Sequence, residues 1–144
     1  MSVDPRSVAR VLGGYRTLGR AIRTVRELQR AVELGLPVAA LDVVVRHLAV
    51  SAAGASELKY RIVPKTTLHR RRRLNVEESQ RLERLARMTA LAEKVWEGAD
   101  DAREFLTTAQ PQLDGERPVD LARSDLGTRR VEELLQKVEY ALPV

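Results

Sequence analysis

The side chains best suited to chemistry form a basic segment near the middle of the chain. Residues 59–73 contain seven Lys or Arg residues and no acidic residue. Cations at this density can neutralise phosphates, and each phosphate contact steepens the salt dependence of nucleic-acid binding. We therefore predict a DNA-binding surface here, the alternative being a solvated basic helix face without a partner. RNA fits less well, because no aromatic stacking platform is interleaved with the cations.

Catalytic and metal chemistry find little support in the residue pattern. The chain has no Cys, and its two His residues, His47 and His69, lack the spacing of metal ligands. No Ser, His and Asp stand out as a catalytic set. The acidic pairs 100–101 and 132–133 are predicted to lie near helix starts, where they complement the helix dipole. We predict no enzymatic activity, no metal site and no cofactor.

Length and charge distribution indicate how the chain is organised around these residues. The chain has 144 residues, 44% of them hydrophobic, which suits one domain or two very small ones. Residues 1–96 contain 19 basic and 9 acidic side chains, whereas residues 97–144 contain 6 and 11. Only the first part suits a polyanion, so we expect two surfaces with different partners. No membrane span or signal-peptide pattern is visible, and we expect a cytoplasmic protein without membrane contact.

Helical spacing of apolar residues predicts an all-α fold without strands. An apolar stripe over residues 18–32 predicts one helix, and a second helix is predicted over 38–50. Residues 52–54 (Ala-Ala-Gly) are expected to interrupt the helix after this second element. A short helix over 57–60, with Ser56 as its N-cap, is expected to follow.

The helix after the basic segment is the most clearly marked element. Asn75 is a favourable N-cap, and Glu78 three residues later has the position of the acidic partner in a capping box. The predicted apolar face of this helix comprises Leu82, Leu85, Ala86, Thr89, Ala92 and Trp96. The next apolar face comprises Ala102, Phe105, Leu106 and Ala109. A last helix is expected from about Leu126, capped by Ser124 or Asp125, and its stripe comprises Val131, Leu134, Leu135 and Val138.

The elements around the basic segment have the order of a helix-turn-helix motif, with the later helix over residues 65–72. In this motif the first residues of the later helix meet base edges in the major groove. Leu68 is expected to face inward and anchor that helix. The predicted DNA-binding residues are Lys65, Thr66, Thr67, His69, Arg70, Arg71, Arg72 and Arg73.

Several stretches of the sequence resemble the Xre/MbcA/ParS antitoxins. Residues 66–82 look like the junction between the reading helix and the next helix of that family. The stretches 115–121 (GERPVDL) and 127–135 (GTRRVEELL) are similar to its C-terminal region, and the resemblance covers roughly residues 36–142. It implies an antitoxin of a type II toxin–antitoxin system with an Xre-like helix-turn-helix. The usual partner in that family is a RES-domain toxin that degrades NAD.

The same resemblance implies a homodimer that binds operator double-stranded DNA and assembles with the toxin into a hetero-oligomer. The C-terminal tail is expected to block the toxin's active site. By resemblance, the toxin-binding residues are Arg129, Arg130, Glu139, Tyr140, Ala141 and Leu142. The residues themselves agree, because an apolar tail that ends in Val144 has little to pack on in a small domain. The alternative is that this tail folds back onto the last helix.

The expected organisation has three parts: an N-terminal helical arm over residues 1–37, a helix-turn-helix domain with its long following helix over 38–96, and a toxin-binding domain over 97–144. One alternative is a stand-alone helix-turn-helix transcriptional regulator without a toxin partner. Another is an interaction module that has lost DNA binding. Loss of the tail distinguishes the antitoxin from the stand-alone regulator, since a regulator should tolerate this loss and an antitoxin should not.

Overall fold

The computed structural model describes residues 3–65 and 71–141. These residues form helices and no strand, apart from an isolated antiparallel bridge between Pro37 and Arg73. The all-α prediction is confirmed. The described elements are α1 (Pro5–Val11), α2 (Gly14–Leu18), α3 (Val25–Leu34), α4 (Val38–Leu48), α5 (Ala52–Ile62), α7 (Val76–Trp96), α8 (Ala99–Thr107), the 3-10 turn η1 (Pro111–Leu113), α9 (Pro118–Leu121) and α10 (Asp125–Ala141).

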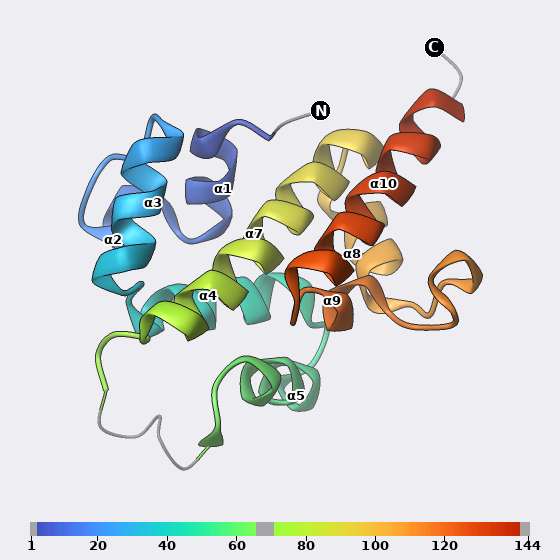
Figure 1. The fold of residues 1–144 in the computed structure, drawn as a ribbon. Helices are drawn as coiled ribbons and strands as arrows, with labels where there is room; N and C mark the ends of the chain where they lie inside the picture. The colour runs from blue at the N-terminus through green and yellow to red at the C-terminus, as the bar shows by residue number, and fades with distance from the viewer. Residues whose placement is uncertain (1–2, 66–70, 142–144) are drawn as a thin grey trace.

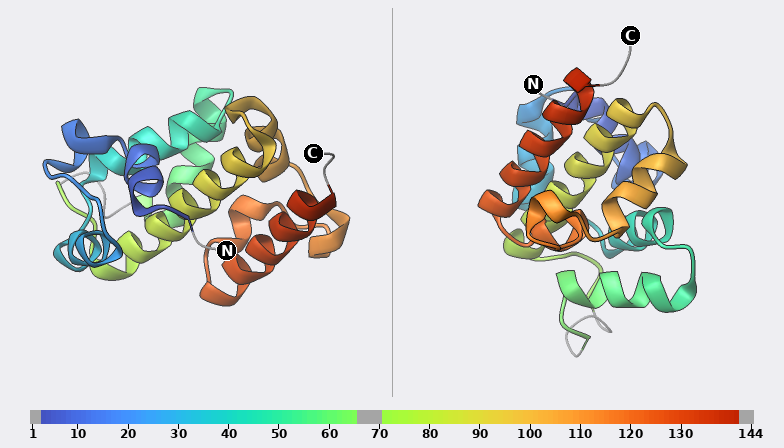
Figure 2. Two further views of the ribbon diagram at one scale, coloured as in Figure 1. Left: turned by 90° about the horizontal axis from the view of Figure 1, so that it is seen from above. Right: turned by 90° about the vertical axis from the view of Figure 1, so that its right-hand side faces the viewer.

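The long helix α7 is the central element of the fold (Figure 1). Its start has the predicted capping box, in which Glu78 N donates to Asn75 Oδ1 at 2.7 Å and Asn75 N donates to Glu78 Oε1 at 2.9 Å. Helices α1 and α3 pack against α7 on one side, and α8 and α10 pack against it on another. The left-hand view of Figure 2 shows α7 between the N-terminal helices and α10.

The prediction of a single helix over residues 18–32 is wrong. Helix α2 ends at Leu18, its C-cap Gly19 has a left-handed φ of 72°, and α3 starts only after Thr24. Thr24 Oγ1 accepts a hydrogen bond from Glu27 N at 3.1 Å and closes a capping box. The stripe is continuous in sequence because Ile22, between the two helices, is buried like Leu28 and Val32 of α3, whereas Val25 at the start of α3 is exposed. Local stop and start signals therefore override the apolar period here.

The break between α4 and α5 also differs from the prediction. It lies at residues 49–51, and Ser51 Oγ accepts a hydrogen bond from Gly54 N at 3.1 Å. Ser51 rather than Ser56 is therefore the N-cap, and residues 52–54 form the first turn of α5. Because a satisfied N-cap fixes the first turn, the Ala-Ala-Gly sequence continues the helix instead of breaking it.

The C-terminal helices largely follow their predicted faces. Ala102, Phe105 and Leu106 are buried, but Ala109 is exposed because α8 ends at Thr107. Ser124 caps α10, since its Oγ accepts a hydrogen bond from Gly127 N at 3.0 Å. Within the predicted stripe of α10, the buried residues are Val131 and Leu135, and the half-buried ones are Leu134 and Val138. Residues 132–133 lie in the middle of α10, so their predicted place near a helix start is wrong.

Candidate functional site

The basic segment is fastened at its N-terminal side to the first half of α7. Ile62, the last residue of α5, is buried, and its carbonyl accepts a hydrogen bond from Arg81 Nη1 at 2.9 Å. Lys65 is exposed, and its Nζ lies 5.7 Å from the centre of the Tyr60 ring. This distance is within the range of a cation–π contact, which keeps the ammonium close to the surface of α5.

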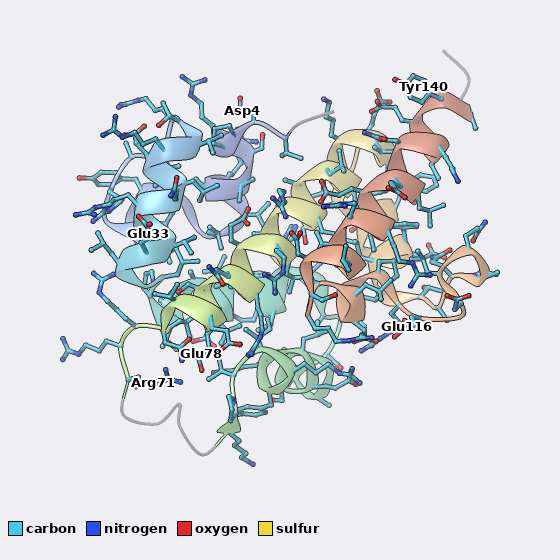
Figure 3. The ribbon with its side chains drawn as sticks, in the orientation of Figure 1. Asp4, Glu33, Arg71, Glu78, Glu116 and Tyr140 are labelled. Atoms are coloured by element: carbon cyan, nitrogen blue, oxygen red, sulfur yellow. The ribbon has the colours of Figure 1, made fainter. Side chains whose placement is uncertain are left out.

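Arg71, on the C-terminal side of the segment, is directed toward α7 (Figure 3). Its Nη1 and Nη2 donate to the two carboxylate oxygens of Glu78 at 2.6 and 2.9 Å. The side chain of Glu78 is only 6% exposed, and the hydrogen bonds from Arg71 lower its pKa. The pair is therefore ionised at neutral pH, and the charge of Arg71 is compensated within the protein.

A short antiparallel pairing holds the end of the segment against the turn between α3 and α4. Val38 N donates to the Arg72 carbonyl at 2.9 Å, and Leu74 N donates to the Leu36 carbonyl at 2.8 Å. These backbone bonds leave the side chain of Arg72 exposed, and Arg73 is exposed as well. The fold thus presents two neighbouring cations on a fixed backbone.

Gly35 makes this close approach possible. Its φ is 94°, and a Cβ at this position would lie 2.5 Å from the carbonyl oxygen of Leu74. The Gly35 carbonyl also accepts a hydrogen bond from Arg73 Nη1 at 2.9 Å. A glycine is required here both for its backbone conformation and for the space it leaves.

The predicted DNA-binding residues therefore differ in their surroundings. Lys65, Arg72 and Arg73 are exposed, whereas Arg71 is bound by Glu78. The predictions for Thr66, Thr67, Leu68, His69 and Arg70 lie outside the described residues. Sequence reasoning did not find the Arg71–Glu78 pair, although the capping box had already singled out Glu78 as a residue fixed at the start of α7.

The predicted toxin-binding residues that the structure describes lie at both ends of α10, with Arg129 and Arg130 near its start and residues 139–141 at its far end. Tyr140 is 87% exposed and Ala141 is exposed, while Glu139 is half-buried (Figure 3). Arg130 Nη2 lies 2.8 Å from Asp114 Oδ2, and Arg129 Nη2 lies 3.9 Å from Asp125 Oδ2. Both arginines are exposed, so these ion pairs contribute little to stability and can be exchanged for contacts with a partner. The predictions for Leu142 and Val144 lie outside the described residues.

An ion-pair network joins the two halves of the chain. Arg117 Nη2 lies 2.6 Å from Glu57 Oε1 on α5, and Arg117 Nε lies 2.9 Å from Asp120 Oδ2 on α9. Asp120 Oδ1 in turn lies 3.0 Å from Arg61 Nη1. The hydrogen bonds to Asp120 and Glu57 raise the pKa of Arg117. The segment over residues 115–121 thus attaches the C-terminal helices to α5, whose last turn contains the first residues of the basic segment.

Another polar contact joins α4 to α7. His47 Nε2 lies 2.6 Å from Glu93 Oε2. Residues 3–65 and 71–141 contain no group of three potential ligands that could hold a metal ion. None of the helices in these ranges combines the length and the apolar character needed to cross a bilayer.

Two protein-family models match the chain one after the other. The first, described as the antitoxin Xre-like helix-turn-helix domain, matches residues 27–87. The second, described as the antitoxin Xre/MbcA/ParS C-terminal toxin-binding domain, matches residues 91–140. The chain belongs to the Xre/MbcA/ParS antitoxin family. The first match contains the basic segment with the contacts that fasten it, and the second contains α8, α9 and nearly all of α10. Because both end or begin inside α7, this helix is shared by the two regions.

A curated relative supports the same assignment. The antitoxin Xre of Pseudomonas putida is 35% identical to this chain over 74 residues. The alignment covers 51% of this chain and 46% of that protein, which is less than half of the relative's length. Membership of the antitoxin family therefore rests on the two domain matches together with this partial alignment.

Proposed function

We propose that this chain neutralises a RES-domain toxin that degrades NAD, and that it binds operator DNA to regulate its own expression. The observation that carries the proposal is the end of α10, where Tyr140 is 87% exposed beside the exposed Ala141. An exposed aromatic group of this kind at the end of a helix is suited to insertion into a partner. The toxin-binding family match over residues 91–140 supports the same surface.

The proposed mechanism of neutralisation is steric. Val131 and Leu135 anchor α10 in the core, which gives the end of the helix a fixed direction. The segment from Glu139 onward then lies across the entrance to the toxin's active site and prevents NAD from reaching it. Arg129 and Arg130 contact the toxin surface beside the entrance, where they exchange their exposed ion pairs for contacts with the partner.

The proposed DNA-binding function rests on the basic segment and on the way it is held. Contacts from α7 and from the turn between α3 and α4 fix the backbone on both sides, which places Lys65 and Arg72 relative to the body of the protein. Phosphate contacts of this kind set register and affinity, whereas base contacts set sequence preference. A homodimer in the cytoplasm would present two such segments to operator half-sites about one helical turn apart.

Co-expression tests the neutralisation step. The full-length chain and a variant that lacks residues 139–144 are each expressed with the product of the adjacent open reading frame, and growth and cellular NAD are measured. We expect the full-length chain to restore both and the truncated chain to restore neither. Tyr140→Ala should reduce the protection. The control is Tyr15→Ala, which changes an exposed tyrosine on α2 and should leave the protection intact.

The outcomes separate the candidate functions. Full protection by the truncated chain would refute the tail mechanism. A neighbouring gene product that does not harm cells would remove the toxin-binding function and favour the stand-alone regulator. Operator binding by the truncated chain, measured in the same strain with a reporter gene, shows whether the DNA-binding function is independent of the tail.

A further inference from the structure

A groove with a volume of about 510 Å³ lies between the N-terminal helices and α10. It belongs neither to the basic segment nor to the exposed end of α10. One wall is apolar and comes from α1 and α3, which supply Val8, Val25, Leu28 and Val32. Val25 is 68% exposed, although it belongs to a helix whose other groove-lining valine, Val32, is buried. Val8, Leu28 and Val32 are buried, so among these four residues the uncovered apolar surface of the wall is that of Val25.

The floor of the groove is charged and comes from α7 and α10. Arg87 lies between two carboxylates, with its Nε 3.9 Å from Glu83 Oε2 and its Nη2 3.8 Å from Glu132 Oε1. Both distances are longer than a hydrogen bond. Among residues 3–65 and 71–141, Arg87 Nε has no hydrogen-bond partner although it is buried. A single guanidinium thus serves two carboxylates without a hydrogen bond to either.

Carboxylates outnumber cations in the groove. Glu33 adds a third carboxylate to Glu83 and Glu132, and Arg87 is the only cation among the described residues that line the groove. The side chain of Glu83 is 16% exposed, and its burial raises its pKa, an effect that the nearby arginines only partly offset. A second cation that reached the floor would stabilise the ionised form of both floor carboxylates.

The groove is continuous with the surface proposed for the toxin. A polar hollow of about 250 Å³ on α10 shares Arg87 and Glu132 with the groove and extends as far as Arg129. Arg129 is one of the predicted toxin-binding residues. A partner that covers this side of α10 therefore reaches the groove without crossing another element.

We infer that the groove is part of the toxin interface and holds a toxin segment in which a Lys or Arg is flanked by apolar residues. The apolar residues cover the wall around Val25, and the cation lies between Glu83 and Glu132. Charge complementarity determines the kind of segment, and continuity with the face of α10 that carries Arg129 determines the partner. The inference rests on the proposed toxin binding and extends it to the N-terminal helices.

Calorimetric binding of the full-length chain to the purified product of the adjacent open reading frame tests the inference. Glu83→Gln combined with Glu132→Gln, and separately Val25→Arg, should each weaken binding about tenfold or more. The controls are Glu77→Gln, an exposed carboxylate at the start of α7, and Val50→Arg, an exposed valine between α4 and α5. Both controls should change the affinity by less than about twofold.

Ionic strength gives a readout that a purely structural role of the two glutamates would not change. If the floor binds a cation, the affinity of the wild type should fall as salt is added, and the double variant should lose part of this dependence. Melting curves of all variants serve as a control for retention of the fold.

Each outcome bears on one claim. If the wild type binds and both groove variants bind equally well, the inference is overturned while toxin binding stands. If the groove variants alter the sedimentation mass of the free chain and not its affinity for the toxin, the groove holds a second copy of the chain, which also overturns the inference. If the wild type does not bind at all, the proposed function fails and the inference fails with it.

Discussion

Alanine substitutions at Arg71 and Arg72 should separate two roles of adjacent arginines. Arg71 is held by both oxygens of Glu78, whereas Arg72 is exposed and forms no ion pair with the described residues. We expect Arg72→Ala to weaken operator binding and to leave thermal stability unchanged. Arg71→Ala should lower thermal stability, because it deprives a buried carboxylate of its bidentate partner. It should have little effect on the salt dependence of DNA binding.

The size of the DNA effect follows from counterion release. One phosphate contact contributes about 0.9 to the slope of log affinity against log salt concentration. Loss of the contact at Arg72 should therefore flatten the slope by about 0.9, so that an increase in salt of about fourfold weakens the wild type about 3.5 times more than the variant. Arg73 should give a smaller change, because its Nη1 is bound to the Gly35 carbonyl.

Fluorescence anisotropy with an operator fragment over a salt series measures these slopes, and thermal melting measures stability. Melting at several pH values adds a check on Arg71. Because Arg71 lowers the pKa of Glu78, its stabilising effect is complete above the ordinary value of 4.5 and is lost as the pH falls through the lower folded value. The wild type should lose more stability than Arg71→Ala below pH 4.5. Equal slopes and equal melting temperatures for Arg71→Ala and Arg72→Ala would refute the reasoning.

Three further predictions, with five substitutions in all, test the fold that supports the site. Leu135→Ala should lower the free energy of unfolding by about 2–5 kcal/mol, and Leu134→Ala by clearly less, since only Leu135 is fully buried; denaturant titration measures both. Gly35→Ala should lower the melting temperature more than Gly19→Ala, because both have a positive φ but only the Cβ at Gly35 would meet a backbone oxygen. Glu83→Gln should stabilise the protein at neutral pH and less below pH 4.5. Burial raises the pKa of Glu83, so the cost of its ionisation appears as the pH rises through the folded value; denaturation at both pH values measures the difference.

Signals between residues close in sequence predicted α7 and α10 well. The Asn75–Glu78 capping box and the cap at Ser124 each join groups three residues apart, so the sequence contains the whole interaction. The same kind of signal occurs at Thr24 and Ser51, and there the cap overrides the apolar stripe and the Ala-Ala-Gly sequence. The stripe misled because burial of Ile22 depends on the loop between α2 and α3 and not on a helical period.

The candidate site was less predictable, because the roles of its arginines depend on groups distant in sequence. Arg73 donates to a carbonyl 38 residues away and Arg81 to one 19 residues away, while the carboxylate that binds Arg71 lies 7 residues away. The planar guanidinium suits a phosphate, a carboxylate and a helix end equally well, so residue type alone does not separate these roles. The basic segment therefore has fewer cations free for phosphate than its sequence contains. The measured salt slope of operator binding should correspond to this smaller number.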